Sequence, residues 1–188
     1  MSKMIYINDL IRLRYIQESD IDDYIRWTTT EIEWADWDAP WETDEDDSLF
    51  LECQRELLNK DPHFYSKLEI HTVDGNHIGW VSCYDTKFDG KNVCAVGIGI
   101  PSPIERNKGY GKAALSAYMA HLFDKEETLY TQTWSGNTPM VRLAEKLGFS
   151  ETERKRYYRE VRGRKYDALT FCITKGAFFK KFPNLSHS

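Results

Sequence analysis

Long hydrophobic runs are missing from this chain of 188 residues. No apolar stretch approaches the roughly 18 residues that a membrane-spanning helix needs, and the start, residues 1–5, lacks the apolar segment of a signal peptide. Cysteine is also scarce, because Cys53, Cys83, Cys94 and Cys172 are the only four and show no paired spacing. Such usage is typical of buried thiols in a reducing compartment. We therefore expect a cytoplasmic protein with no disulfide and no membrane contact.

Metal-ligand patterns and an excess of basic charge are absent as well. No Cys/His cluster has the spacing of a metal site, so we expect no metal, and each scattered histidine is expected on the surface or in packing. These histidines are His63, His71, His77, His121 and His187. The formal net charge of −5 disfavours nucleic acid binding.

One local run of basic residues goes against this overall acidity. Seven lysines and arginines lie within twelve positions of the C-terminal third, and they suit a solvated hairpin, or a basic rim beside a cofactor phosphate or a dimer partner. They are Arg154, Lys155, Arg156, Arg159, Arg162, Arg164 and Lys165.

Strand-like and helix-like patterns alternate along the chain and predict an α/β fold. Hydrophobic content of 41% and aromatic content of 14% are sufficient for a core, and the length suits one domain, residues 1–188. Strands are predicted at 10–15, 64–73, 77–84, 93–100, 129–134, 149–158 and 165–173. Helices are predicted at 19–27, 43–59, 109–123 and from Asn137 onward. Ser19 is the expected N-cap of the first helix, with Asp20, Asp22 and Asp23 in its first turn.

The segment from 106 to 112 has the character of an anion-binding loop. It follows a predicted strand and opens a predicted helix, where backbone N–H groups and the helix dipole favour an anion. Glycine allows a phosphate to approach the backbone closely, and the lysines and arginine add positive charge. The segment reads Arg106, Asn107, Lys108, Gly109, Tyr110, Gly111 and Lys112. We interpret it as the site for the pyrophosphate of a nucleotide-bearing cofactor.

Three loop motifs compete for this segment. The P-loop string G-x-x-x-x-G-K-[S/T] does not occur in the chain. The dinucleotide pattern G-x-G-x-x-G/A is filled by Gly109, Gly111 and Ala114, but the next strand ends at Trp134 without the acidic residue that holds a ribose. The third pattern, [Q/R]-x-x-G-x-[G/A], is filled by Arg106, Gly109 and Gly111, and in it the chain resembles the GCN5-related N-acetyltransferase (GNAT) family.

The resemblance extends beyond the loop. Residues 137–149, from Asn137 to Gly148 and Phe149, are similar to the family's second signature, and residues 11–24 resemble its ribosomal-protein-alanine and polyamine acetyltransferase branch. The resemblance implies a twisted, mostly antiparallel sheet of about seven strands with about four helices, and a V-shaped splay between the fourth and fifth strands. It also implies acetyl-CoA as co-substrate and N-acetyltransferase activity. Dimers are common in that branch, which leaves a homodimer open.

The resemblance also assigns cofactor-binding residues. Backbone groups of Ile98, Gly99 and Ile100 would bind the pantetheine arm, and the loop from Arg106 to Lys112 would bind the pyrophosphate. Asn137 would orient the arm, and Lys146 would meet the adenosine-phosphate end. Glycine in a short strand has an alternative explanation, which is a bulge or a close helix crossing.

No catalytic residue can be assigned by resemblance. Many relatives carry a glutamate as general base where this chain has Val96, and a tyrosine as general acid where it has Ala144. Other groups could supply these roles, or positioning alone could lower the barrier. The alternative is a non-catalytic acyl-CoA sensor or interaction module.

The acceptor side is suggested by a window without lysine or arginine between Trp27 and Gln54. Carboxylates alternate there with tryptophans, which suits a cationic amine. The alternative is a solvated acidic loop whose tryptophans pack in the core, with residues 44–47 explained by helix capping. We assign substrate binding to Glu33, Trp34, Asp36 and Asp38, and expect the acceptor to be a small-molecule amine or a peptide N-terminus.

Overall fold

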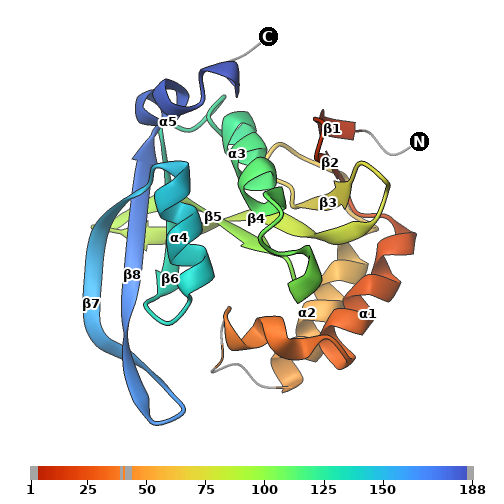
Figure 1. Cartoon of the computed structure of the whole chain (residues 1–188), viewed down its shortest axis with the longest axis horizontal. Helices are drawn as coiled ribbons and strands as arrows, with labels where there is room; N and C mark the ends of the chain where they lie inside the picture. The colour runs from red at the N-terminus through yellow and green to blue at the C-terminus, as the bar shows by residue number, and fades with distance from the viewer. Residues whose placement is uncertain (1–3, 39, 41–43, 186–188) are drawn as a thin grey trace. The chain divides into compact units, whose positions relative to one another are not determined.

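The computed structural model describes residues 4–38, 40 and 44–185 and confirms the predicted α/β fold (Figure 1). The described residues form eight strands and five α-helices, against the seven and four expected. The additions are β1, at the N-terminus, and α5, which Thr174 caps by accepting a hydrogen bond from the Ala177 N–H. Trp41, Glu42 and Thr43, which belong to the predicted acidic window and helix start, lie outside the described residues.

The other elements follow the predicted order. The strands are β1 (Met4–Ile7), β2 (Ile11–Arg14), β3 (Leu68–Thr72), β4 (His77–Phe88), β5 (Lys91–Gly99), β6 (Thr128–Trp134), β7 (Ser150–Val161) and β8 (Arg164–Thr174). The α-helices are α1 (Ile21–Thr29), α2 (Asp44–Leu57), α3 (Tyr110–Leu122), α4 (Thr138–Leu147) and α5 (Lys175–Lys181).

The chain forms two compact units. The first contains Met1–Ser82 and Ile98–Ala114, and the second contains Cys83–Gly97 and Leu115–Ser188. In the first unit, β1, β2, β3 and β4 are antiparallel neighbours in chain order. In the second unit the order is β4, β5, β6, β8, β7, with β5 parallel to β6 and the β6–β8 and β8–β7 pairs antiparallel. The organisation into one domain stays a prediction.

Alternation along β2 and β3 gives the sheet of the first unit one apolar and one polar face. Ile11 and Leu13 are fully buried, and the residues between them, Arg12 and Arg14, point to the other face because successive strand side chains alternate. Arg12 lies opposite His71, and Arg14 lies opposite Glu69. Charged side chains therefore line the second face of these strands.

Helix α1 buries Tyr24 and Trp27, which form an aromatic cluster with Trp80 of β4. The helix does not begin as predicted, because a 3-10 turn (Glu18–Asp20) precedes it and places Ser19 before the α-helix. The carboxylate of Asp20 holds this turn by accepting a hydrogen bond from the Gln17 N–H. The prediction of Ser19 as N-cap was therefore wrong.

In the second unit, residues at both ends of α4 cap the helix. Asn137 accepts a hydrogen bond from the Met140 N–H at the N-terminus, and Gly148 ends the helix with φ 95°. The parallel ladder between β5 and β6 is limited, among the described residues, to the pair Ala95 and Tyr130. Such a short ladder accords with the predicted splay, because these are the fourth and fifth predicted strands.

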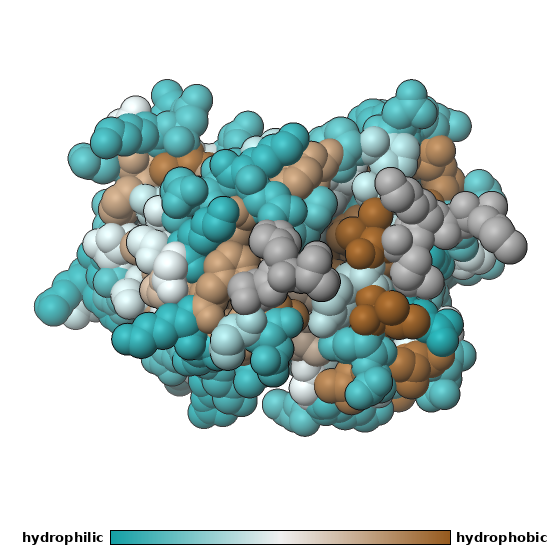
Figure 2. Space-filling model, turned by 90° about the horizontal axis from the view of Figure 1, so that it is seen from above, coloured by the Kyte–Doolittle hydropathy of each residue, from teal (hydrophilic) through white to brown (hydrophobic). Residues whose placement is uncertain are grey.

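Figure 2 shows one face of the molecule, where hydrophilic side chains predominate and hydrophobic ones form small separate groups. Exposed large hydrophobic side chains include Ile7, Ile32 and Ile104. None of the helices in the described part of the chain is long and apolar enough to cross a membrane.

Candidate functional site

The loop before α3 has the backbone of an anion site. Arg106 is extended, Asn107 has φ 62° and Gly109 has φ 90°, and the Ala113 N–H donates to the Gly109 carbonyl, 3.0 Å away, at the start of the helix. Left-handed residues in such a turn make adjacent N–H groups converge on one side, and the first N–H groups of a helix lack partners within the helix. Asn107, Lys108 and Gly109 are exposed, so the backbone of the loop is accessible to a phosphate.

The side chain of Arg106 secures this loop. Its Nε donates to the Ile100 carbonyl at 2.9 Å, and Nη2 donates to the Pro101 carbonyl. Its Nη1 lies 2.7 Å from a carboxylate oxygen of Glu33. The guanidinium thereby joins the loop to the end of β5 and to the 3-10 helix Ile32–Asp36. Of the loop lysines, Lys108 pairs with Glu105 at 3.0 Å and Lys112 is exposed.

Close packing accounts for the glycine at the end of β5. A Cβ on Gly99 would lie 2.4 Å from the ring of Trp80, and one on Gly79 would lie 2.0 Å from the Gly99 carbonyl oxygen. The close neighbours belong to strand β4, whereas the sequence left open a bulge or a close helix crossing. The binding of a pantetheine arm by Ile98, Gly99 and Ile100 stays a prediction, and the two explanations are compatible.

The remaining predicted cofactor residues lie in the second unit. Asn137 is buried and its side-chain oxygen caps α4, whereas Lys146 is exposed in the last turn of that helix. Their roles toward a cofactor stay predictions. Val96 and Ala144 are also in this unit and are at most 1% exposed. Both side chains are apolar, so neither position offers an ionisable group.

Some residues of the acidic segment pack against the protein, and others are exposed to solvent. Trp34 donates its indole N–H to the Trp27 carbonyl at 2.8 Å and packs against Trp80 and Phe50, as the packing interpretation expects. Glu33 pairs with Arg106 and also accepts a hydrogen bond from the Trp37 indole. Asp36 and Asp38 are exposed, so they are better placed than Trp34 to meet a cationic substrate.

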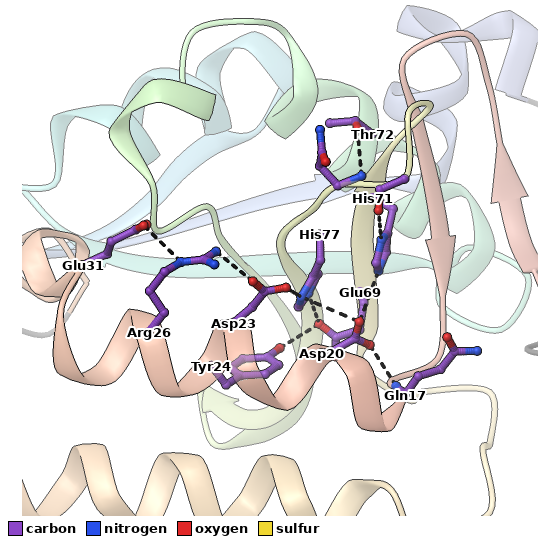
Figure 3. Close-up of polar contacts among 12 residues, drawn as sticks. Gln17, Asp20, Asp23, Tyr24, Arg26, Glu31, Glu69, His71, Thr72 and His77 are labelled. Atoms are coloured by element: carbon purple, nitrogen blue, oxygen red, sulfur yellow. Dashed lines mark hydrogen bonds and ion pairs between the residues drawn. The ribbon is translucent and has the colours of Figure 1, made fainter.

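A cavity of about 640 Å³ opens in the first unit beside α1. Its wall comes from α1, β2, the β3–β4 hairpin and residues 102–105 next to the loop. Figure 3 shows the polar side chains that gather here from α1, β3 and β4. Sequence analysis did not find this cluster, which includes Asp20, Asp23, Glu69, His71 and His77.

Charges in the cluster compensate one another. Arg14 contacts both carboxylate oxygens of Asp20 at 2.7 Å, and His77 lies 3.0 Å from both Asp23 and Glu69. Burial disfavours a charged imidazole, but hydrogen bonds to these two carboxylates outweigh it and raise the pKa of His77 to about 9. Burial and the positive charges of Arg14 and His77 lower the pKa of His71. His77 is therefore charged at neutral pH and His71 is neutral.

The sequence does contain a weak signal for this cluster. Glu69 and His71 are two residues apart in a predicted strand, as are Arg12 and Arg14, so each pair shares a face. That pattern predicts a polar face on two strands, but it does not predict that the strands pair or that α1 covers them.

Lys67 lies beside the cluster and gives a testable pH dependence. Its ammonium donates to the Tyr24 hydroxyl and the Gln54 side-chain oxygen, lies 3.9 Å from Glu69, and lies over the rings of Tyr24 and Trp80. Burial lowers the pKa of Lys67 to about 8, against the raising effect of Glu69 and the more distant Asp20 and Cys53.

Between about pH 8 and pH 10.5, folded Lys67 is neutral while the unfolded lysine still holds its proton. The unfolded state binds more protons there, so the contribution of Lys67 to the free energy of unfolding rises with pH, by up to about 3 kcal/mol. Denaturant unfolding measured across this pH range should show a free energy of unfolding that rises with pH more in the original protein than in Lys67→Met. A Lys60→Met control, at an exposed lysine, should keep the pH dependence of the original protein. A pH profile for Lys67→Met identical to that of the original protein would contradict this account.

Comparison with known proteins agrees with the motifs. A family model described as an acetyltransferase (GNAT) domain matches residues 11–150. A sequence comparison with curated proteins finds no match.

Solved structures of similar fold include three acetyltransferases. Spermidine N-acetyltransferase from Vibrio cholerae, solved with CoA and spermine, has TM-score 0.68 and 19% identity, and the match covers 92% of this chain and 99% of that one. Ribosomal-protein-S5-alanine acetyltransferase from Vibrio fischeri has TM-score 0.71 and 13% identity, covering 94% and 98%. The RimL ribosomal L7/L12 alpha-N-protein acetyltransferase, solved with CoA, has TM-score 0.71 and 14% identity, covering 93% and 99%.

At these identities the structures establish the fold alone, and the family model covers most of the chain. This protein belongs to the GNAT acetyltransferase family.

Proposed function

We propose that this protein transfers the acetyl group of acetyl-CoA to a primary amine on a small cationic molecule or a protein N-terminus. The observation that carries the proposal is the loop from Arg106 to Lys112, whose exposed backbone with positive φ at Asn107 and Gly109 leads into α3. That geometry fits a pyrophosphate. Similar folds solved with CoA support the choice of cofactor.

Acetyl-CoA would supply an activated thioester, and the protein would supply binding and orientation. Loop N–H groups would hold the pyrophosphate, while Arg106 keeps the loop attached to β5 through the Ile100 carbonyl. Exposed Asp36 and Asp38 would attract a cationic amine. Positioning of the two substrates can itself contribute several kcal/mol to rate acceleration, so activity does not require a side-chain base at Val96.

The acceptor proposal rests on charge and on relatives whose names include spermidine and ribosomal proteins. A test is CoA release from acetyl-CoA with a panel of polyamines, aminoglycosides, amino acids and short peptides. We expect saturable turnover with one class. Asp36→Asn and Asp38→Asn should then raise KM for that amine several-fold and leave KM for acetyl-CoA unchanged, with Asp61→Asn as an exposed acidic control.

The second candidate is an acyl-CoA sensor without catalysis, which the buried, apolar Val96 and Ala144 favour. It predicts tight acetyl-CoA binding and no CoA release with any amine. That result would overturn the enzymatic proposal and retain the cofactor site. We also propose that the protein is cytoplasmic and forms a homodimer. Cell fractionation would test the location, and light scattering would test the oligomeric state.

A further inference from the structure

Three side chains of the polar cluster, those of Asp20, His71 and His77, place ligand atoms within 4.8 Å of one another beside the cavity of the first unit, and Asp23 contacts His77. Asp20 ends the 3-10 turn before α1, Asp23 lies in the first turn of α1, His71 comes from β3 and His77 begins β4 (Figure 3). Asp20 Oδ1 lies 3.7 Å from His71 Nε2 and 3.8 Å from His77 Nδ1, and Asp23 Oδ2 lies 3.0 Å from the same His77 nitrogen. Ligand atoms around one tetrahedral zinc ion lie roughly 3.4 Å apart. The spacing of these atoms is therefore close to that of a metal site.

His71 presents an unshared electron pair to this point. Its Nδ1 lies 3.2 Å from the Gly75 carbonyl oxygen, which can only accept, so Nδ1 carries the hydrogen and Nε2 carries the lone pair. The side chain is 9% exposed, and Nε2 has no hydrogen-bond partner among the described residues. A buried acceptor thus faces the carboxylate of Asp20, and two facing acceptors require a positively charged or hydrogen-donating group between them.

Each of the four side chains is oriented by an outer partner. His77 Nε2 lies 3.0 Å from Glu69, and the Gly75 carbonyl fixes His71. Asp20 is held by Arg14 and Asp23 by Arg26, at 2.7 and 2.8 Å. Carboxylate or carbonyl partners on the distal nitrogen of metal-bound histidines are the usual arrangement in such sites, because they fix the tautomer and the ring direction.

The donor atoms of the side chains determine which metal ion the site would prefer. Imidazole nitrogen together with carboxylate suits zinc and neighbouring transition metals, whereas magnesium and calcium prefer oxygen alone. A metal at this point would take the position of the proton that His77 shares with Asp23, and that proton would leave to solvent. Binding would tie α1 to the β3–β4 hairpin, so it should stabilise the fold.

We propose that Asp20, His71 and His77 form a binding site for a divalent transition metal of the zinc class, with Asp23 as the carboxylate beside His77. The site is independent of acetyl transfer, because it is formed within α1, β3 and β4 and uses none of the loop residues from 106 to 112.

The test is titration of the full chain, without an affinity tag, with Co²⁺ followed by absorption spectroscopy and calorimetry. We expect one equivalent to bind, with visible bands of four-coordinate cobalt and without the near-ultraviolet band that thiolate ligands produce. The unfolding temperature should rise with metal concentration. His71→Gln should weaken binding at least about 100-fold, since it removes the imidazole ligand, and His63→Gln, at an exposed histidine of the same unit, should bind like the original protein.

Two further variants keep the test valid if His71→Gln does not fold. Asp23→Asn changes the carboxylate beside His77 Nδ1, and its side chain is 22% exposed. Glu69→Gln changes the partner of His77 Nε2. We expect each of these outer changes to weaken binding about 10-fold. Three results would overturn the proposal. They are an absence of Co²⁺ binding at concentrations up to about 100 μM, a thiolate band that marks a cysteine site, and equal affinity in the ligand variants. A water bridging Asp20 and His71 would give the first of these results.

Discussion

Gly109→Asp is expected to weaken acetyl-CoA binding about 100-fold, which corresponds to about 2.7 kcal/mol. Gly109 is exposed in the loop before α3, and its nearest neighbour at the Cβ position is Leu10 Cδ1, 4.0 Å away. A carboxylate therefore fits without a clash, but it places a negative charge where the pyrophosphate would bind. Repulsion between unit charges about 4 Å apart near a protein surface is of the order of 4 kcal/mol. Calorimetry with acetyl-CoA measures the change directly.

Gly109→Asn is the matched control for this prediction. Gly109 has φ 90°, and asparagine and aspartate are the side chains that best tolerate that backbone region. The two variants have nearly equal size and backbone strain, so they should unfold at similar temperatures and differ in charge alone. We expect Gly109→Asn to lose no more than several-fold in affinity. Equal affinity of both variants would remove the loop from the cofactor site, whether the protein is an enzyme or a sensor.

Gly79→Ala is expected to destabilise the first unit by about 3 kcal/mol or to prevent folding. The added Cβ would lie 2.0 Å from the carbonyl oxygen of Gly99, and φ at Gly79 is 155°. The clashing atom belongs to the backbone of β5, so no side-chain rotation relieves it and the strands must separate. Denaturant unfolding would give the change in free energy.

Gly75→Ala separates this clash from backbone strain. Gly75 also has a positive φ, 93°, but nothing lies within 4 Å of its Cβ position, so we expect a loss of only about 1 kcal/mol. Gly176→Ala lies in α5 with open space around it and should stabilise slightly, because alanine favours a helix over glycine by about 1 kcal/mol. If Gly79→Ala cost no more than Gly75→Ala, the close crossing of β4 and β5 would be wrong.

Secondary structure and the position of the loop before α3 could be predicted because their determinants are contiguous. The loop combines Arg106, Gly109 and Gly111 within six residues, and its strand and helix adjoin it. The caps of α4 at Asn137 and Gly148 are likewise local. In contrast, β1 is a four-residue strand that exists through its pairing with β2, and short strands carry too little pattern of their own.

Side-chain partners at long range could not be predicted. The sequence assigned Arg106 to a cofactor and Glu33 to a substrate, and the structure pairs them at 2.7 Å. Trp34 was assigned to an amine, and its ring packs in the cluster with Trp80, 46 residues later in the chain. Charge and residue type define what a side chain can bind, but the folded chain decides which partner reaches it first.

The sequence by itself determined the α/β alternation and the strand–loop–helix order around residues 106–112, because each depends on local spacing and backbone preference. Its motifs also carried the resemblance to the GNAT family, which the family model shows. Only the tertiary structure brought His71 and His77 together with Asp20 and Asp23. Aspartates at the start of a helix and histidines scattered along the chain have no sequence spacing that marks a site. The register of β2, β3 and β4 and the packing of α1 bring them into one cluster. Long-range register is set by burial of the whole core, which no short window of sequence contains.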